Sequence, residues 1–104
     1  MNNNHQQALQ DQIDSALVVV FRSSLTEMVA LRRTLDNLNI NYLEIEFGMA
    51  DRMLRERFHC LQTLTGHHQL PQVFIASKFV GGGDDAIHSQ ELIQLANSSK
   101  DTSH

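Results

Sequence analysis

Apolar side chains recur every three or four positions in four segments of the chain, the spacing that places them on one face of a helix. The first segment covers about ten residues and ends at Asp14 and Ser15. The three other segments are residues 25–38, 50–64 and 86–97. Gly66 follows the third segment, and glycine often ends a helix because it adopts the left-handed conformation easily. The pattern therefore predicts four helices.

Shorter apolar runs between these segments predict strands. The run ALVVVF is continuous and rich in β-branched residues, which is typical of a strand buried on both faces. Residues 41–47 alternate apolar and polar side chains instead, so we expect Glu44 and Glu46 on the more exposed face of a second strand. Two further runs, at 72–77 and 79–82, follow each other closely and predict a hairpin.

The order of these elements predicts an α/β fold with a single domain. A helix connects the first two strands, and because such crossovers are right-handed the two strands should be parallel. With the antiparallel hairpin added, we expect a mixed sheet of about four strands with helices on both faces. A chain of 104 residues is long enough for one such domain. We expect an N-terminal extension with a short helix at 1–15, the domain at 16–97 and a disordered tail at 98–104.

Composition excludes several classes of function. The net charge of -4 provides no basic surface for a phosphate backbone, so nucleic acid is not an expected partner. The longest apolar run is far shorter than the roughly 20 residues of a membrane helix. The N-terminus does not show the charged and then apolar pattern of a signal peptide, so we expect a cytoplasmic protein. Cys60 is the only cysteine, which rules out an internal disulfide and a metal site built from several cysteines of one chain.

Several stretches of the sequence resemble the glutaredoxin family. VVVF resembles the family's first strand, LQTLTG followed by LPQVFI resembles its helix end with the T-V-P and V-F-I pattern, and FVGGGDD resembles its I-G-G-C-D-D signature. The resemblance covers roughly residues 5–97 and is most specific in the C-terminal half. It implies a thioredoxin-like fold of the glutaredoxin type. It also implies a family activity, the glutathione-dependent reduction of disulfides, and thereby a link to redox homeostasis.

The catalytic motif of the family is missing where the resemblance places it. Glutaredoxins have C-P-Y-C or C-G-F-S at the start of the first long helix, and the first cysteine reacts as a thiolate held by the helix N-terminus. Here Leu25, Thr26, Glu27 and Met28 replace the motif. Counting from the preceding strand aligns the nucleophile with Thr26, whereas counting back from the helix aligns it with Leu25. We therefore expect a loop one residue shorter than the family's and a degenerate active site without a thiolate.

The hydroxyl groups near this helix start have a catalytic and a structural interpretation. An alcohol without an adjacent base is a poor nucleophile and cannot exchange with a disulfide, so we expect no catalytic role for Ser24 or Thr26. We expect one of them to cap the helix by accepting hydrogen bonds from its first amides. Glu27 lies three residues after Ser24, which suits a capping box. Its negative charge would oppose a neighbouring thiolate or a bound anion.

The resemblance also implies a groove for glutathione. In the family, the cysteinyl part of the ligand pairs with the backbone before a cis proline, and its γ-glutamyl end meets a glycine turn and an aspartate. The matching positions here are Leu70, Pro71, Gly82, Gly83, Asp84 and Asp85. The turn also has a structural interpretation, because glycines can connect a hairpin to a helix and Asp84 or Asp85 can cap the last helix.

Two more positions concern the carboxylates of glutathione. A basic residue before the motif, which contacts one carboxylate in the family, matches Arg22 in one alignment and Ser23 in the other. A glutamine or arginine of the second long helix that often contacts another carboxylate is replaced by Phe58. The expected affinity for glutathione is therefore low.

Two classes of function remain open. The first is a non-catalytic module, related to thiol redox processes, that binds glutathione or an extended segment of peptide or protein. The second is an enzyme, a glutathione-dependent oxidoreductase or transferase, in which bound glutathione supplies the sulfur and Ser24, Thr26 or Arg22 orients its thiol. Loss of both motif cysteines favours the first class, so we expect no catalytic residue, no metal and no required cofactor. A homodimer formed through an edge strand or the first helix is compatible with both.

Overall fold

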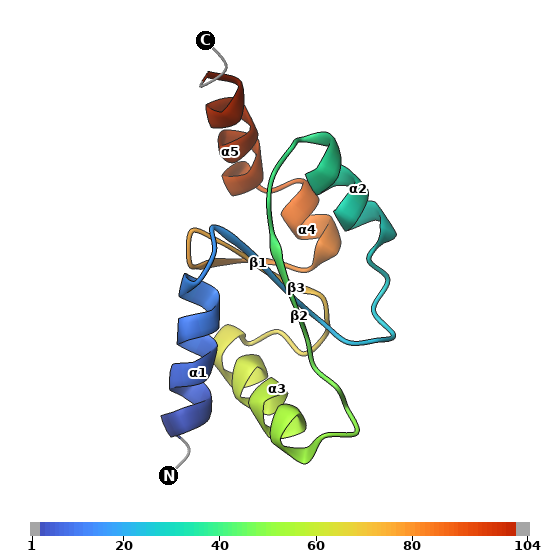
Figure 1. Cartoon of the computed structure of the whole chain (residues 1–104), viewed down its shortest axis with the longest axis vertical. Helices are drawn as coiled ribbons and strands as arrows, with labels where there is room; N and C mark the ends of the chain where they lie inside the picture. The colour runs from blue at the N-terminus through green and yellow to red at the C-terminus, as the bar shows by residue number, and fades with distance from the viewer. Residues whose placement is uncertain (1–2, 102–104) are drawn as a thin grey trace.

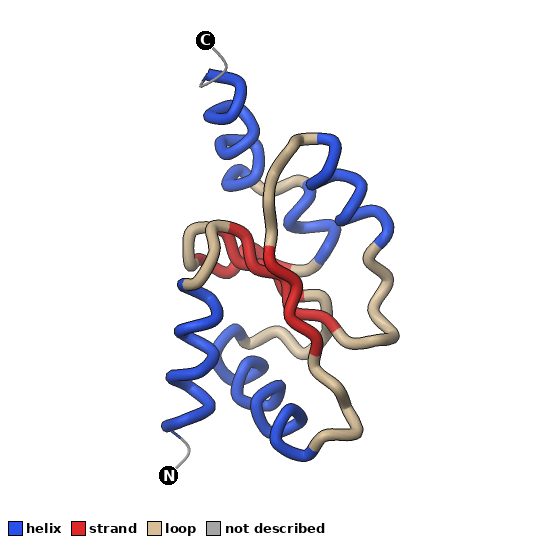
Figure 2. Tube along the Cα trace, in the orientation of Figure 1, coloured by secondary structure: helices blue, strands red, loops and turns tan. Residues whose placement is uncertain are grey.

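The structure is a computed structural model that describes residues 3–101. The elements of this part of the chain are α1 (Asn3–Asp14), β1 (Val18–Arg22), α2 (Val29–Asn37), β2 (Leu43–Glu46), α3 (Arg52–Thr65), β3 (Gln72–Ile75), β4 (Lys78–Gly81), α4 (Gly83–Ile87) and α5 (Gln90–Asp101) (Figure 1). The strands form one sheet with helices on both sides (Figure 2). None of the helices described is both long and apolar enough to cross a membrane.

The sheet is mixed, which confirms the prediction from the sequence. Its strand order is β2-β1-β3-β4, with β1 parallel to β2 and antiparallel to β3, and β3 antiparallel to β4. In this register Val20 of β1 lies between Glu44 of β2 and Val73 of β3. The hairpin between β3 and β4 turns at Ala76 and Ser77, which both have positive φ, as the favoured two-residue hairpin turn requires.

Alternate side chains of β1 fill two separate cores, one on each side of the sheet. Val18 and Val20 pack in the core that α2, α4 and α5 cover, whereas Val19 and Phe21 pack in the core that α1 and α3 cover (Figure 1). In the second core Phe21 stacks on Phe47 with 5.5 Å between ring centroids. Burial of apolar surface on both faces explains why β1 consists of a continuous apolar run.

The helix α2 begins at Val29, four residues after the predicted start at Leu25. Leu25 lies in a turn and is 94% exposed, so it contributes to neither core. Side chains of residues 23–26 form hydrogen bonds with nearby backbone groups, and such local bonds compete with helix formation. The prediction of a helix over 25–38 was therefore wrong at its N-terminal end.

The last predicted helix is divided into α4 and α5 at Ser89. The Ser89 hydroxyl donates a hydrogen bond to the carbonyl oxygen of Ala86 at 2.8 Å, and it accepts one from the amide of Leu92 at 3.1 Å. The same hydroxyl therefore closes α4 and caps α5. The helix α5 continues to Asp101, whereas the sequence suggested a disordered tail from residue 98. Residues 102–104 of the proposed tail lie outside the described residues.

The ends of α3 follow ordinary capping rules. Asp51 accepts hydrogen bonds from the amides of Met53 and Leu54 at the N-terminal end. Gly66 ends the helix in the left-handed conformation with a φ of 72°, which confirms the sequence-based prediction.

Gly81 and Gly66 allow a matched test of backbone strain and steric contact. Gly81 has a φ of 115°, and a β-carbon there would lie 2.6 Å from Cβ of Asp85. Gly66 also has positive φ, but a β-carbon there would meet no atom within 4 Å. We predict that Gly81→Ala lowers the free energy of unfolding by more than about 2 kcal/mol and Gly66→Ala by about 1 kcal/mol, as measured by urea denaturation. Equal losses of unfolding free energy in the two variants would argue against the steric contact with Asp85.

Candidate binding groove

A groove of about 380 Å³ lies beside the segment that replaces the catalytic motif. It is bordered by the loop after β1, by α3 and the segment before it, and by the loop before β3. The lining residues are Ser23, Leu25, Thr26, Glu27, Met49, Phe58, Gln69 and Leu70. Met28, the last residue of the degenerate motif, is instead buried in a core with 4% of its surface exposed. The structure thus brings three of the four motif residues together with Leu70.

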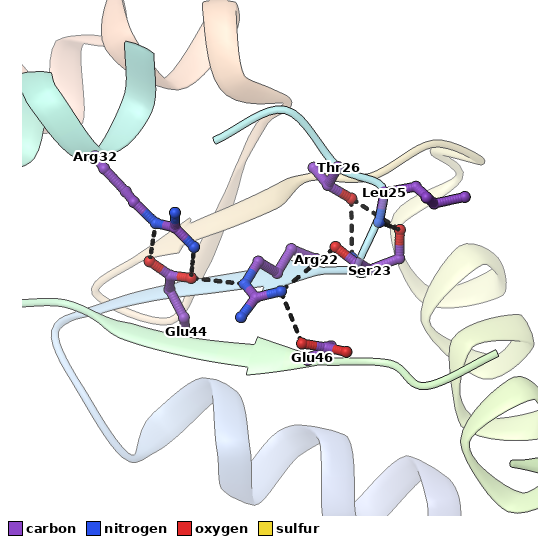
Figure 3. Close-up of polar contacts among 7 residues, drawn as sticks. All are labelled: Arg22, Ser23, Leu25, Thr26, Arg32, Glu44 and Glu46. Atoms are coloured by element: carbon purple, nitrogen blue, oxygen red, sulfur yellow. Dashed lines mark hydrogen bonds and ion pairs between the residues drawn. The ribbon is translucent and has the colours of Figure 1, made fainter. Parts of the chain in front are cut away.

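Two hydroxyl groups hold the loop after β1 in a tight turn. Thr26 Oγ1 accepts a hydrogen bond from the Ser23 amide at 2.8 Å and lies 3.0 Å from Ser23 Oγ (Figure 3). The Leu25 amide donates to Ser23 Oγ at 3.3 Å, and the side chain of Leu25 projects away from the turn (Figure 3). Because Thr26 bonds within this turn, it does not cap α2 as the sequence suggested.

The carboxylate of Glu27 caps α2 instead of Ser24 or Thr26. Both of its oxygens lie 3.0 Å from the amide nitrogen of Val29, and Oε1 lies 3.5 Å from that of Ala30. Such amides at the start of a helix have no backbone partner within the helix. A negative charge therefore already occupies the position where a thiolate or a ligand anion would gain from the helix N-terminus.

Arg22 points toward the edge of the sheet and does not border the groove. Its Nε donates a hydrogen bond to Glu44 at 2.6 Å, and its Nη1 donates to Glu46 at 2.8 Å (Figure 3). Arg32 of α2 binds the same Glu44 carboxylate with two hydrogen bonds of 2.7 and 2.8 Å. These four side chains join α2, β1 and β2. The contact with a ligand carboxylate that the resemblance suggested for Arg22 would require these ion pairs to break.

The charges in this cluster stabilise one another. Hydrogen bonds from Arg32 lower the pKa of Glu44 to about 2, helped by those from Arg22 and opposed by burial. The hydrogen bond to Glu44 likewise raises the pKa of Arg22 above its usual value. Glu44 therefore remains ionised far below neutral pH.

The loop before β3 packs against the glycine turn before α4. The Leu70–Pro71 peptide bond is cis, as the resemblance implied. A β-carbon at Gly82 would lie 3.6 Å from the carbonyl oxygen of Pro71, and one at Gly83 would lie 3.6 Å from Pro71 Cγ. Four of the residues that the resemblance grouped therefore lie close together, but of these only Leu70 borders the groove.

Asp84 and Asp85 lie in the first turn of α4 and are exposed. The N-cap residue of α4 is Gly82, so neither aspartate caps the helix as the structural interpretation proposed. Their charges are favourable at the positive end of a helix. Neither residue borders the groove, although their turn packs on Pro71.

Sequence reasoning missed the role of Gln72, which is completely buried. Its Nε2 donates hydrogen bonds to the carbonyl oxygens of His67 at 2.7 Å and Gln69 at 3.2 Å, and its Oε1 accepts one from the Thr65 hydroxyl at 2.9 Å. These bonds fix the loop that carries Leu70. The available signal was a polar residue at the start of an otherwise apolar strand.

Cys60 is half-buried on α3 and lies outside the groove, in a separate cleft that also includes residues of α1. It therefore does not replace the missing nucleophile. Among residues 3–101 no group of three or more His, Cys, Asp or Glu side chains could hold a metal ion.

Glu44 and Glu46 provide a matched pair for testing the arginine cluster. The side chain of Glu44 is 19% exposed and binds two arginines, whereas that of Glu46 is 44% exposed and binds Arg22. We predict that Glu44→Gln lowers the free energy of unfolding at neutral pH by about 2 kcal/mol and Glu46→Gln by less than about 1 kcal/mol.

The effect of Glu44→Gln should also depend on pH. Because its pKa is lowered on folding, the stability from Glu44 is present above its ordinary value of 4.5 and is lost as the pH falls to about 2. The difference between the wild type and Glu44→Gln in urea denaturation should therefore shrink over this interval. A difference that stays constant across it would show that ionisation of Glu44 is not its source.

Solved structures that resemble this chain are glutaredoxins. A buckwheat glutaredoxin–glutathione complex has 23% identity and a TM-score of 0.80, over 93% of this chain and 91% of that one. A wheat glutaredoxin has 27% identity and a TM-score of 0.79 over 92% of each chain. The holo form of glutaredoxin C1 from a poplar, Populus tremula x tremuloides, has 23% identity and a TM-score of 0.79, over 91% of this chain and 97% of that one. No family model and no curated protein matches the sequence. The chain therefore has the glutaredoxin type of the thioredoxin-like fold, with Cys60 as its only cysteine.

Proposed function

We propose that this protein is a non-catalytic binding module, related to thiol redox processes, whose groove holds an extended peptide segment. The observation that supports the proposal is the groove itself, whose lining includes Leu70 together with Leu25 and Thr26 of the segment that replaces the motif. A site with this surface and without a thiol can bind a peptide but cannot exchange a disulfide. The buckwheat relative binds glutathione, so glutathione and a protein segment are the two sources of such a peptide.

The side chains of the groove favour a ligand with apolar groups. Leu25 is almost fully exposed, Met49 is exposed, and Phe58 and Leu70 are half-buried. A ligand that covers such surface removes it from water, which contributes roughly 25 cal/mol for each Å² of apolar area. A protein segment with apolar side chains therefore gains more binding free energy from this surface than glutathione does.

The charges around the groove favour a neutral or basic ligand. Glutathione carries two carboxylates and one ammonium group, so it is a net anion at neutral pH. Arg22 is held by Glu44 and Glu46, and the Glu27 carboxylate lies on the rim of the groove. Repulsion from one like charge at such an exposed position amounts to about 1 kcal/mol, or roughly fivefold in affinity. We therefore propose a protein segment as the preferred ligand, with glutathione as a weak one.

The enzymatic alternative has less support. It requires Arg22 or a hydroxyl group to orient the thiol of bound glutathione. Arg22 is engaged in the ion pairs with Glu44 and Glu46, and the Thr26 hydroxyl is engaged in the turn with Ser23. Two of the three groups named for that role are thus used to hold the fold, and the third, the exposed Ser24, does not border the groove.

The two ligand sources can be compared by titration with amide chemical shifts as the readout. The probes are reduced glutathione and a short peptide with blocked ends that contains one lysine and two leucines. We expect both to shift the amides of Thr26 and Leu70, with the peptide saturating at a lower concentration. Glu27→Gln should lower the affinity for the peptide and raise the affinity for glutathione, each about fivefold.

Asp11→Asn is the control, because it removes the same charge from an exposed position on α1. It should leave both affinities unchanged. The proposed function fails if neither probe moves the amides of Thr26 and Leu70 at millimolar concentration. The preference for a protein segment fails if glutathione binds more tightly than the peptide.

A further inference from the structure

A second and larger cleft lies between α1 and α3, which are neighbours on the same side of the sheet (Figure 1). Its volume is about 960 Å³, at the upper end of the range for small-molecule sites. None of its lining residues belongs to the groove beside Leu70. The cleft is therefore a separate candidate site.

The ionisable side chains that line this cleft are mainly basic. They are Arg52, Arg55, His5 and His59, against the single acid Glu56. The chain as a whole has a net charge of -4, so this basic character is local and does not follow from composition. A cleft with one sign of charge concentrates small ions of the opposite sign.

Arg52 and Arg55 lie one helical turn apart at the start of α3 and line the same cleft. Arg55 Nη1 donates a hydrogen bond to the carbonyl oxygen of Met49 at 2.7 Å, which orients its guanidinium group. A guanidinium group has five N–H donors, so this bond leaves others to face a ligand. Two neighbouring guanidinium groups match the oxygens of a phosphate or carboxylate.

The charge of Glu56 is balanced by its neighbours. Its carboxylate lies 3.3 Å from Arg52 Nε and 3.5 Å from His5 Nε2. His5 Nδ1 in turn accepts a hydrogen bond from Arg57 Nε at 3.4 Å, so the neutral ring can donate from Nε2 to Glu56. This chain of contacts ties α1 to α3 and leaves Arg55 as an uncompensated positive charge of the lining.

The far end of the cleft is apolar, with the exposed side chain of Leu64 beside Cys60. We propose that the cleft between α1 and α3 binds a small organic anion, whose phosphate or carboxylate meets Arg52 and Arg55 while its apolar body extends along α3 toward Cys60. This site shares no lining residue with the peptide groove, and the proposal does not rest on the function proposed for that groove.

Cys60 provides a direct readout, because it is the only cysteine of the chain and it lines the cleft. The experiment measures the rate at which iodoacetamide, an uncharged reagent, alkylates Cys60 in the presence of phenyl phosphate. We expect phenyl phosphate to slow alkylation in a saturable way. Benzyl alcohol, which has the ring without the charge, should have no such effect, and inorganic phosphate should protect only at higher concentration.

Arg55→Gln should raise the phenyl phosphate concentration needed for half-protection about tenfold, because it removes a charge-assisted contact. Arg55 is exposed, so the substitution should not affect folding. Arg33→Gln removes an exposed arginine from α2 and should leave protection unchanged. Absence of protection at millimolar phenyl phosphate, or equal protection in Arg55→Gln, would overturn the proposal. Equal protection by inorganic phosphate would overturn the contribution of the apolar body.

Discussion

The buried amide of Gln72 is the contact on which the groove depends. Its hydrogen bonds tie the backbone of the loop after α3 to the first residue of β3. This loop carries Leu70, which lines the groove, and Pro71, against which Gly82 and Gly83 pack. Without the amide, the part-buried carbonyl groups of His67 and Gln69 would lose these hydrogen bonds, each of which contributes about 1 kcal/mol. One polar side chain in an apolar core thus holds the groove and the start of α4 in place.

The polar groups near the other wall of the groove form contacts within the protein, whereas a glutaredoxin would use groups at these positions for catalysis. Glu27 satisfies the amides at the start of α2, so the positive end of the helix already has its anion. Arg22 is drawn to the edge strand by Glu44 and Glu46. Ser23 and Thr26 bond to each other. The fold of a glutaredoxin is present, whereas Arg22, Thr26 and Glu27 have partners within the protein.

The sequence predicted the features that depend on local pattern. Continuous apolar runs marked the buried parts of β1 and β3, and Gly66 marked the end of α3, because each follows from a short stretch of chain. Features that depend on individual polar contacts were missed. The hydroxyl groups of Ser23 and Thr26 shift the start of α2 to a later residue, and Ser89 divides the last helix. At both places a side chain competes with the backbone for hydrogen bonds.

The candidate site was predictable only where backbone shape defines it. The cis bond at Pro71 and the packing of the glycine turn came from the resemblance, which depends on residue types at fixed spacing. The ion pairs of Arg22 could not be predicted from the resemblance, because its partners Glu44 and Glu46 are 22 and 24 positions away in the sequence. Such ion pairs can be predicted only when the register of β1 and β2 is known.

We propose that this glutaredoxin-like fold binds a ligand without turnover. The most direct test is the rate at which reduced glutathione cleaves a glutathione mixed disulfide in the presence of increasing amounts of this protein. We expect the rate of glutathione alone at every protein concentration, and the same rate for Cys60→Ser. A rate that rises in proportion to the protein concentration would contradict it.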